Sequence, residues 1–119
     1  MDSSSPTGYL RVRVSSGGGA YPVSGAIVLV KNADAEGGNS GVLYSLRTDS
    51  SGLTLTVPLP AKLLTDEGGE EFTPYNVEVI KEGYYRAMID GVQAYDGVSA
   101  VLPVNLVPVG YGDAPYGTG

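Results

Sequence analysis

The chain has 119 residues, which is enough for one domain with a single hydrophobic core and too few for two. It contains no cysteine and no histidine, which excludes disulfide bonds, thiolate nucleophiles, Ser-His-Asp triads and conventional zinc sites. Thirteen acidic and seven basic residues give a net charge of −6, and this charge argues against nucleic-acid binding because it repels a phosphate backbone.

Short apolar runs alternate with turn residues along the whole sequence. Eighteen Gly and eight Pro fall between these runs, a distribution typical of many short strands joined by turns. No stretch approaches the roughly 20 apolar residues of a membrane span, and residues 1–8 lack the basic and apolar regions of a Sec signal. We therefore expect a soluble chain without membrane insertion, exported if at all by another route or from a longer precursor.

The first two predicted strands differ in polarity. Leu10, Val12 and Val14 alternate with Arg11 and Arg13, which indicates a half-buried strand with one solvated face. After a turn at Gly17 to Gly19, Ala26 to Val30 is apolar on both faces. We expect this second strand at the centre of a sheet or under a bound partner.

The next two predicted strands flank a turn at residues 49–52. Residues 42–47 alternate in polarity after a polar loop at residues 34–41. In the strand after the turn, Leu53, Leu55, Val57 and Leu59 are expected to alternate with Thr54, Thr56 and Pro58. Because Pro58 and Pro60 have no N–H to donate, the end of this strand should lie at a sheet edge or outside the sheet.

The remaining chain predicts three more strands. Residues 61–73 form a long crossing with room for one short helical turn, and residues 75–81 alternate cleanly. Residues 85–89 and 98–109 supply the last strands, joined through turns at Asp90-Gly91 and Asp96-Gly97, since Gly adopts the positive φ that tight turns require.

Together these elements predict an all-β fold, an antiparallel Greek-key β-sandwich of about seven strands. The sandwich is expected to cover residues 9–109. Residues 1–8 are expected to form an N-terminal arm, and residues 110–119 a Gly/Tyr-rich C-terminal tail.

Three short signatures mark corners of the predicted sandwich: Pro22 to Ala26, Thr48 to Gly52, and Glu82 to Tyr85. With the opening run Gly8 to Val14 and the Leu59-Pro60 pair, their order resembles that of carboxypeptidase regulatory-like, or transthyretin-like, β-sandwich domains. The later part of the chain looks like versions from Clostridium-like bacteria that occur beside cell-wall and spore-associated enzymes. The resemblance implies a scaffold, and activity depends on sites grafted onto it.

Two covalent chemistries known in similar domains are disfavoured. Hydrolases among transthyretin-like proteins depend on histidine, which this chain lacks, so we expect no enzyme activity and no cofactor. Related adhesin repeats form a Lys to Asn or Asp isopeptide bond, for which Lys31, Glu78 and Asn105 supply residue types. The family places that Lys on the first strand, where this chain has Arg11 and Arg13. We expect Lys31 to lie at a strand end and Glu78 to face solvent.

A calcium site is a weaker alternative than simple acidic loops. The carboxylates that could contribute are Asp34, Glu36, Asp66, Glu67, Glu70 and Glu71. Calcium takes six to eight oxygen ligands, but this spacing matches no EF-hand loop. We therefore predict solvated acidic loops and no metal site.

Nine tyrosines, with no Trp and one Phe, are the unusual aromatic feature. Four of them are expected in the core, on a sheet face or at a corner: Tyr9, Tyr44, Tyr75 and Tyr84. Tyr95, Tyr111 and Tyr116 lie in loop or tail contexts, where an amphipathic ring favours contact with a partner or a sugar. We predict these three as candidate partner-binding residues.

The function that the sequence favours is a non-catalytic structural or interaction module. Such a module would self-assemble or join a surface, spore, phage-like or extracellular assembly through its edge strands and tails. The alternative is a carbohydrate or peptidoglycan binding module that is accessory to an enzyme, and small-molecule transport ranks third. We expect an extracellular or cell- or spore-surface location, while a cytoplasmic one stays open.

Overall fold

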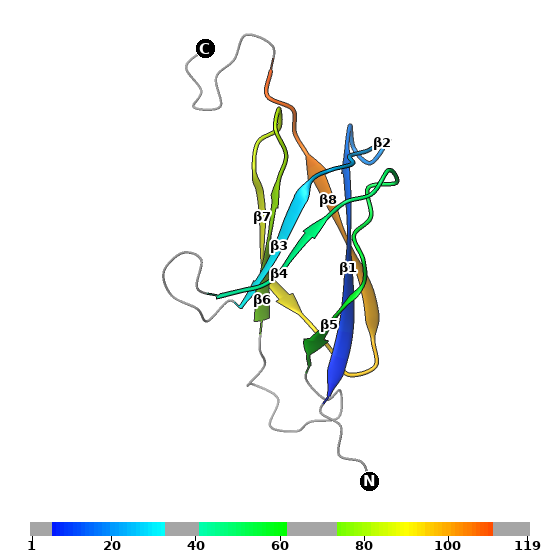
Figure 1. Ribbon diagram of the computed structural model, residues 1–119, viewed down its shortest axis with the longest axis vertical. Coiled ribbons are helices and arrows are strands. Elements are labelled where there is room, and N and C mark those ends of the chain that lie inside the picture. Colours follow the sequence, from blue (N-terminus) through cyan, green and yellow to red (C-terminus); the bar gives the residue numbers. More distant parts are fainter. Residues whose placement is uncertain (1–5, 33–40, 62–73, 111–119) are drawn as a thin grey trace.

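The computed structural model describes residues 6–32, 41–61 and 74–110, and its eight strands form two facing sheets (Figure 1). Sheet A contains β1 (Thr7–Ser16), β2 (Tyr21–Pro22), β5 (Val57–Pro60) and β8 (Ser99–Leu106). Sheet B contains β3 (Ile27–Asn32), β4 (Val42–Arg47), β6 (Pro74–Ile80) and β7 (Ala87–Gln93). The predicted all-β sandwich is confirmed, with eight strands described instead of about seven.

β1 is the organising strand of sheet A. It pairs with β8 on one side and with β5 and β2 on the other. The β1–β8 pair is parallel over eight residue pairs, from Tyr9 opposite Ser99 to Ser16 opposite Leu106, whereas the other strand pairs are antiparallel. β1 begins at Thr7.

Sheet B has the order β4-β3-β6-β7, so the doubly apolar β3 lies between two strands. The predicted position of this strand at the centre of a sheet is confirmed. Its alternate residues Val28 and Val30 are fully buried, while Ile27 and Leu29 on the outer face are half-buried.

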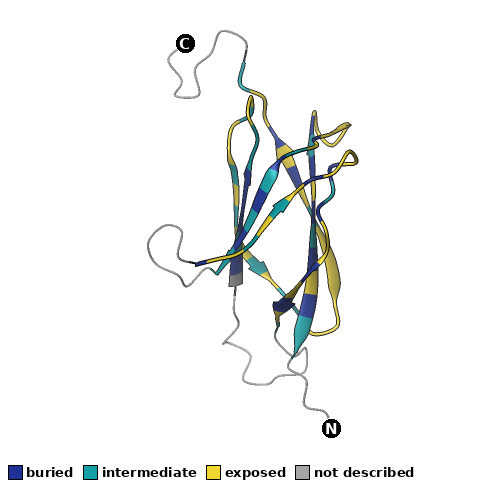
Figure 2. Ribbon diagram, viewed as in Figure 1, coloured by how far each residue is buried: buried dark blue, intermediate teal, exposed yellow. Residues whose placement is uncertain are grey.

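The core lies between the sheets and is built mainly from Val and Leu at alternate strand positions (Figure 2). Its members with no more than 1% exposure include Val12, Val14, Val28, Val30, Leu59, Tyr75, Val77, Val79 and Leu106. The period of two in β1, β3 and β6 gives each strand one core face, as the sequence pattern predicted.

The predicted unbroken alternation from Leu53 to Leu59 is wrong. β5 begins only at Val57, and Leu55 is 75% exposed while Thr54 is 1% exposed. The Thr54 hydroxyl accepts the Val12 N–H at 3.0 Å and donates to the Leu55 carbonyl at 2.9 Å. Because a side chain replaces a backbone partner of β1 here, the alternation is interrupted before β5.

Two of the corner signatures meet through Thr48. Its buried hydroxyl accepts the Ala26 N–H at 2.9 Å and donates to the Val23 carbonyl at 2.7 Å. Backbone bonds from Gly25 N–H to the Thr48 carbonyl and from Thr48 N–H to the Ala26 carbonyl, each 3.0 Å, complete the contact. The hydroxyl therefore satisfies two buried backbone groups where the chain passes from one sheet to the other.

Asp49 should make the fold sensitive to acid. Its carboxylate accepts N–H groups of Leu53 and Ser51, and these bonds lower the Asp49 pKa. A lowered folded-state pKa contributes stability above the unfolded-state value, and this contribution is lost as pH falls through the folded-state pKa. We expect Asp49→Asn to flatten the fall in unfolding free energy below about pH 4, measured by urea unfolding across pH. An unchanged slope would contradict this role.

The predicted turn at Asp90-Gly91 is also wrong. β7 continues through these residues to Gln93, and the β6–β7 register shifts between Tyr75 and Val77. Gly91 has φ of +76° and donates its N–H to Asn76 Oδ1 at 3.3 Å. Glycine adopts positive φ easily, which favours it in turns. In this strand the same property allows a β-bulge.

Candidate functional site

The outer edge of β8 is the first candidate surface. Tyr9 N–H donates to the Val98 carbonyl at 2.9 Å, so odd-numbered residues of β1 direct their backbone groups toward β8. The Val12 carbonyl and the Val14 N–H bond on the opposite side, to Thr54 and Gly52. In this parallel register, the even-numbered residues of β8 bond to β1.

The odd-numbered residues of β8 consequently direct their backbone groups away from β1. These residues are Ser99, Val101, Pro103 and Asn105. Within the described residues no strand pairs with this side of β8. Pro103 removes one N–H from the row, which fits the placement of proline on sheet edges. The edge still presents four carbonyls and the N–H groups of Ser99, Val101 and Asn105.

The β5 edge of sheet A is closed by contrast. Pro58 lies opposite Tyr9, and Pro60 lies opposite Thr7. Because the backbone groups of Tyr9 and Thr7 point toward β8, those of the two prolines point away from β1. Both prolines lack an N–H, and their carbonyls accept the hydroxyls of Tyr44 at 2.8 Å and Tyr75 at 2.6 Å. The sequence-based prediction of an edge position for these prolines is confirmed.

Burial raises the pKa of the Tyr75 hydroxyl, which donates to the Pro60 carbonyl. The two edges of sheet B are each interrupted by a register shift, in β4 opposite Val30 and Lys31, and in β7 near Gly91. Bulges of this kind blunt an edge against strand addition. Among the four described edges, β8 thus offers the longest regular row of backbone groups.

A small pocket of about 210 Å³ adjoins the start of this edge. Val92 at the end of β7 and Ala94 just after it line one side, and Val98 and Ala100, before and within the start of β8, line the other. The pocket therefore lies between the two edge strands. Its other walls come from Tyr9, Leu10, Leu59, Gln93 and Tyr95. The lining is mainly apolar, with one amide and two phenols.

Tyr95, a predicted partner-binding residue, is placed at this pocket with its hydroxyl bonded to Gln93 Oε1. The other two candidates, Tyr111 and Tyr116, lie outside the described residues. Tyr9, which the sequence suggested only as a core or sheet-face residue, also lines the pocket and is 41% exposed. Nothing in the local sequence distinguishes it from other strand tyrosines.

Hydrogen bonds hold the pocket wall at residues 94–98 against β1. Thr7 N–H donates to Asp96 Oδ1, and Gly97 N–H donates to the Thr7 carbonyl, both at 2.9 Å. A Cβ on Gly8 would lie 2.7 Å from the Tyr95 carbonyl oxygen, so glycine permits this close approach. The pocket wall is therefore held in place by backbone contacts and by the Asp96 side chain.

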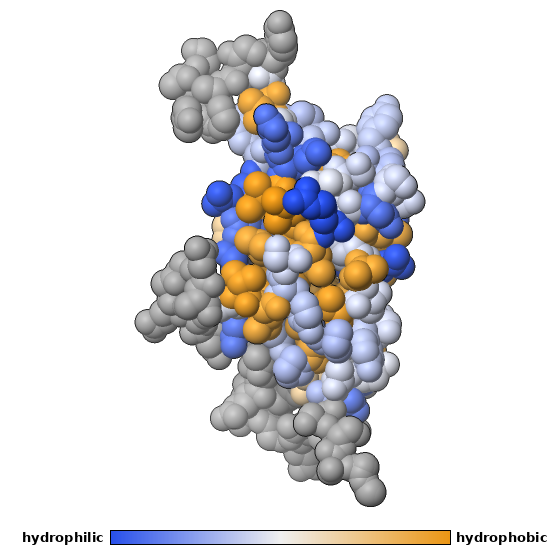
Figure 3. Space-filling view, viewed as in Figure 1, coloured by the Kyte–Doolittle hydropathy of each residue, from blue (hydrophilic) through white to orange (hydrophobic). Residues whose placement is uncertain are grey.

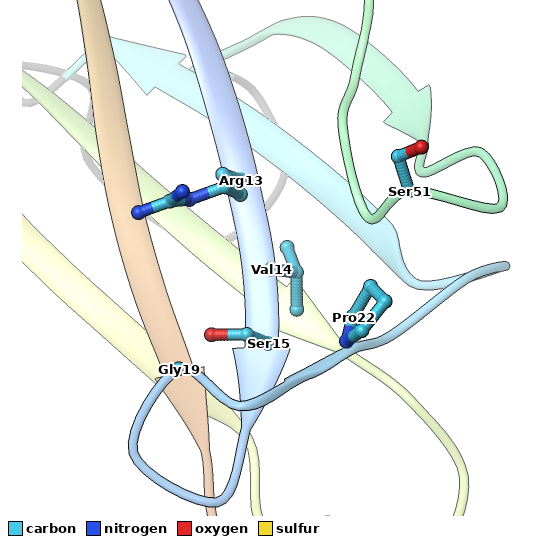
Figure 4. Close-up of a pocket in the computed structure, with 6 residues that line it drawn as sticks. All are labelled: Arg13, Val14, Ser15, Gly19, Pro22 and Ser51. Carbon is cyan, nitrogen blue, oxygen red and sulfur yellow. The ribbon is translucent and has the colours of Figure 1, made fainter.

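Arg13 lies close to the middle of the β8 edge. It is opposite Pro103 in the register, its side chain is exposed on the outer face of sheet A, and Figure 4 shows its guanidinium extending across β8. It also borders a pocket of about 190 Å³ with Ser15, Gly19, Pro22 and Ser51 (Figure 4). No carboxylate of the described residues pairs with Arg13.

A charged cluster occupies the outer face of sheet B, and it corrects the expectation that Glu78 faces solvent. The Glu78 side chain is only 7% exposed, with Oε1 2.6 Å from Lys31 Nζ and Oε2 2.9 Å from Arg86 Nε. Lys31 lies within β3, opposite Asn76. The two cations shield the carboxylate from water and stabilise its charge.

We expect Glu78→Gln to lower the unfolding free energy by about 1–3 kcal/mol, because the half-buried Lys31 amine loses its anionic partner. Arg86→Gln is the matched control and should cost less than about 1 kcal/mol, since Arg86 is 61% exposed. Urea unfolding measures both. Equal losses of unfolding free energy in the two variants would show that the Lys31 amine is not stabilised by its ion pair with Glu78.

Apolar side chains surround this cluster. Figure 3 shows them across the middle of the visible face, where β3 and β4 run, with hydrophilic side chains among them. Leu43 is 45% exposed and Met88 is 58% exposed. The strand register places Leu29 between Ser45 and Glu78, so charged and apolar groups are interleaved across sheet B.

The residues of the disfavoured isopeptide bond are not brought together. Asn105 lies in sheet A, where its Oδ1 accepts the Gly18 N–H at 3.0 Å, while Lys31 and Glu78 lie in sheet B. The six carboxylates considered for calcium all fall outside the described residues. Within residues 6–32, 41–61 and 74–110, no group of three or more carboxylates could hold a metal ion.

No helix in the described part of the chain has the length and hydrophobicity needed to cross a membrane. No family model matches the sequence, and no curated protein matches it either. Comparison with solved structures provides evidence on the fold alone.

Three solved structures illustrate the likeness. A minor pilin of Streptococcus agalactiae, GBS52, has a TM-score of 0.59 and 15% identity, with 92% of this chain and 48% of that chain covered. A 3-chlorocatechol 1,2-dioxygenase of Rhodococcus opacus 1CP has a TM-score of 0.58 and 18% identity, with 91% of this chain and 62% of that chain covered. The Bacillus anthracis TIE protein has a TM-score of 0.54 and 19% identity, with 87% of this chain and 17% of that chain covered.

The chain spans less than two thirds of each of these structures. Their identities with it are all below 20%, so they show a shared β-sandwich fold and nothing of shared chemistry. A pilin and an enzyme on the same scaffold leave the function to be argued from the surface of this chain.

Proposed function

We propose that the chain is a non-catalytic assembly module that joins a surface or extracellular structure by pairing another polypeptide with the free edge of β8. The observation that carries this proposal is the contrast between edges: β5 is closed by two prolines and two tyrosine hydroxyls, whereas β8 presents an eight-residue strand with one proline. Unpaired N–H and C=O groups along an edge favour strand addition.

The same proposal includes self-assembly, in which a second copy supplies the added strand. The pilin and TIE likenesses are compatible with a surface or assembly module. The order of the corner signatures supports kinship with carboxypeptidase regulatory-like or transthyretin-like domains of Clostridium-like bacteria. An extracellular or cell-surface location belongs to this proposal, and so does the absence of enzymatic activity.

Replacing Val101 with proline tests the use of this edge. The Val101 N–H faces away from β1, so Val101→Pro should remove one hydrogen-bond donor from the free edge. The β1–β8 ladder should be preserved, because Pro103 already occupies an equivalent position in it. If copies assemble through β8, sedimentation velocity of the wild-type chain should show concentration-dependent oligomers, and the variant should shift toward monomer by about tenfold in dissociation constant, the equivalent of about 1.4 kcal/mol.

Val101→Thr is the matched control, because it keeps the N–H and a β-branched side chain in the strand. It should assemble as the wild type does. A wild-type chain that stays monomeric at all concentrations would contradict self-assembly, and equal assembly by both variants would contradict the use of β8.

A carbohydrate or peptidoglycan binding module is the second candidate. It is favoured by Tyr9 and Tyr95 at one pocket beside the Gln93 amide, since aromatic rings and amides are suited to sugars. Pull-down with purified peptidoglycan tests it, with Tyr9→Ala as the variant expected to lose binding. Unchanged retention of that variant would exclude this pocket as the sugar site.

A further inference from the structure

We propose that the β8 edge recognises an extended segment of a partner protein that carries an apolar residue and an acidic residue three positions apart. This inference rests on the proposed function, because it names the chemistry of the strand that the edge accepts. Three features carry it: the free backbone row of β8, the pocket at the start of β8, and the Arg13 guanidinium beside Pro103.

The backbone row fixes the position of the added strand. It would accept and donate hydrogen bonds at the four odd-numbered residues from Ser99 to Asn105, except for the missing N–H of Pro103. Main-chain bonds of this kind give affinity without regard to sequence, while pockets for alternate side chains give specificity. The segment can extend only as far as Val107, whose carbonyl already accepts the Tyr85 N–H at 2.9 Å.

The pocket selects an apolar side chain. Side chains of an added strand alternate between the outer face and the space between the sheets. A residue opposite Ala100 points inward, toward the pocket between β7 and β8. Its volume of about 210 Å³ is below the roughly 300–1,000 Å³ of small-molecule sites, so it suits one aliphatic or aromatic side chain.

Arg13 selects an acidic side chain. A residue opposite Pro103 points to the outer face, where Arg13 extends across β8 (Figure 4). The charged residues that sheet A presents on this face within the described ranges are Arg11 and Arg13, and the Arg11 Nε is bonded to the Thr54 carbonyl at 2.9 Å on the β5 side. Arg13 is therefore the cation available to a partner at the edge.

The spacing follows from the register. Ala100 and Pro103 are three residues apart and direct their partners to opposite faces. A bound segment should consequently place its apolar and acidic residues at positions n and n+3, or in the reverse order if it runs the other way. This pattern distinguishes the proposed partner from a strand that binds by backbone contacts alone.

Selection from a random nine-residue peptide library, with the full chain as bait, tests the pattern. We expect enrichment of peptides with an apolar and an acidic residue three apart. The selected peptide should bind at least tenfold more weakly to Val101→Pro, measured by fluorescence polarisation. Val101→Thr should bind it as the wild type does, since its N–H is retained.

Two further variants separate the pocket from the charge. Ala100→Leu should fill the pocket and abolish the preference for an apolar residue over serine in matched peptides. Arg13→Gln should abolish the preference for glutamate over glutamine and weaken the dependence of binding on salt. Each variant should leave the other preference intact, so a general loss of folding would be recognised by loss of both.

Selected peptides without this spacing, or peptides that bind Val101→Pro unchanged, would overturn the inference. Self-association of the chain with no peptide enriched would also overturn it, and would leave a second copy as the occupant and the proposed assembly function standing. Enrichment of the pattern by a chain that stays monomeric would support the inference while removing self-assembly from the proposed function.

Discussion

Gly52→Ala is expected to lower the unfolding free energy by about 3–5 kcal/mol, among the largest losses of any single substitution in the described chain. Gly52 has φ of +79°, and a Cβ there would lie 2.4 Å from the Val14 carbonyl oxygen. That oxygen accepts the Val23 N–H at 3.0 Å, and the Gly52 carbonyl accepts the Val14 N–H at 2.7 Å. Relief of the clash must therefore move β1 or break these bonds.

Gly91→Ala is the matched control, because Gly91 has nearly the same φ, +76°, with no atom within 4 Å of the added Cβ. It should cost only the backbone strain, about 1–2 kcal/mol. Urea unfolding of both variants separates the strain from the clash. Equal losses would mean that β1 yields to the methyl group without cost.

Tyr75→Ala is expected to lower the unfolding free energy by a similar amount, about 3–5 kcal/mol. Tyr75 is the largest of the fully buried side chains, at 1% exposure, and its hydroxyl reaches the Pro60 carbonyl of the opposite sheet. Removal of the ring leaves a cavity in the core and frees the closed β5 edge.

Tyr75→Phe separates these two contributions. The ring stays in the core, and the unpaired Pro60 carbonyl should cost about 1 kcal/mol. Urea unfolding measures the difference. A loss in the Phe variant equal to that in the Ala variant would place the stabilisation in the hydrogen bond and contradict the cavity explanation.

The sequence predicted those parts of the fold in which backbone alternation and side-chain polarity agree. β1, β3 and β6 follow the period of two closely, and the edge position of Pro58 and Pro60 follows from their missing N–H groups. It did not predict the exposure of Leu55, because the Thr54 hydroxyl takes a backbone partner that only the folded chain supplies.

The site was predictable to a smaller extent. Tyr95 was singled out by its loop context, and it does line a pocket. The contribution of Arg13 depends on the parallel pairing of β1 with β8, two segments about 90 residues apart in the chain, and no local pattern encodes that pairing. Burial of Glu78 likewise requires Lys31 from the neighbouring strand β3 and Arg86 from the segment just before β7.

The parallel pairing of β1 with β8 has a mechanical consequence. Tension applied at Thr7 and Leu106 pulls the two strands along their length in opposite directions, across a ladder of eight residue pairs. The load is then shared by all the ladder hydrogen bonds in shear, whereas an antiparallel terminal pair would open one bond at a time. A subunit held at these two ends within a surface fibre would resist extension through this one pair of strands.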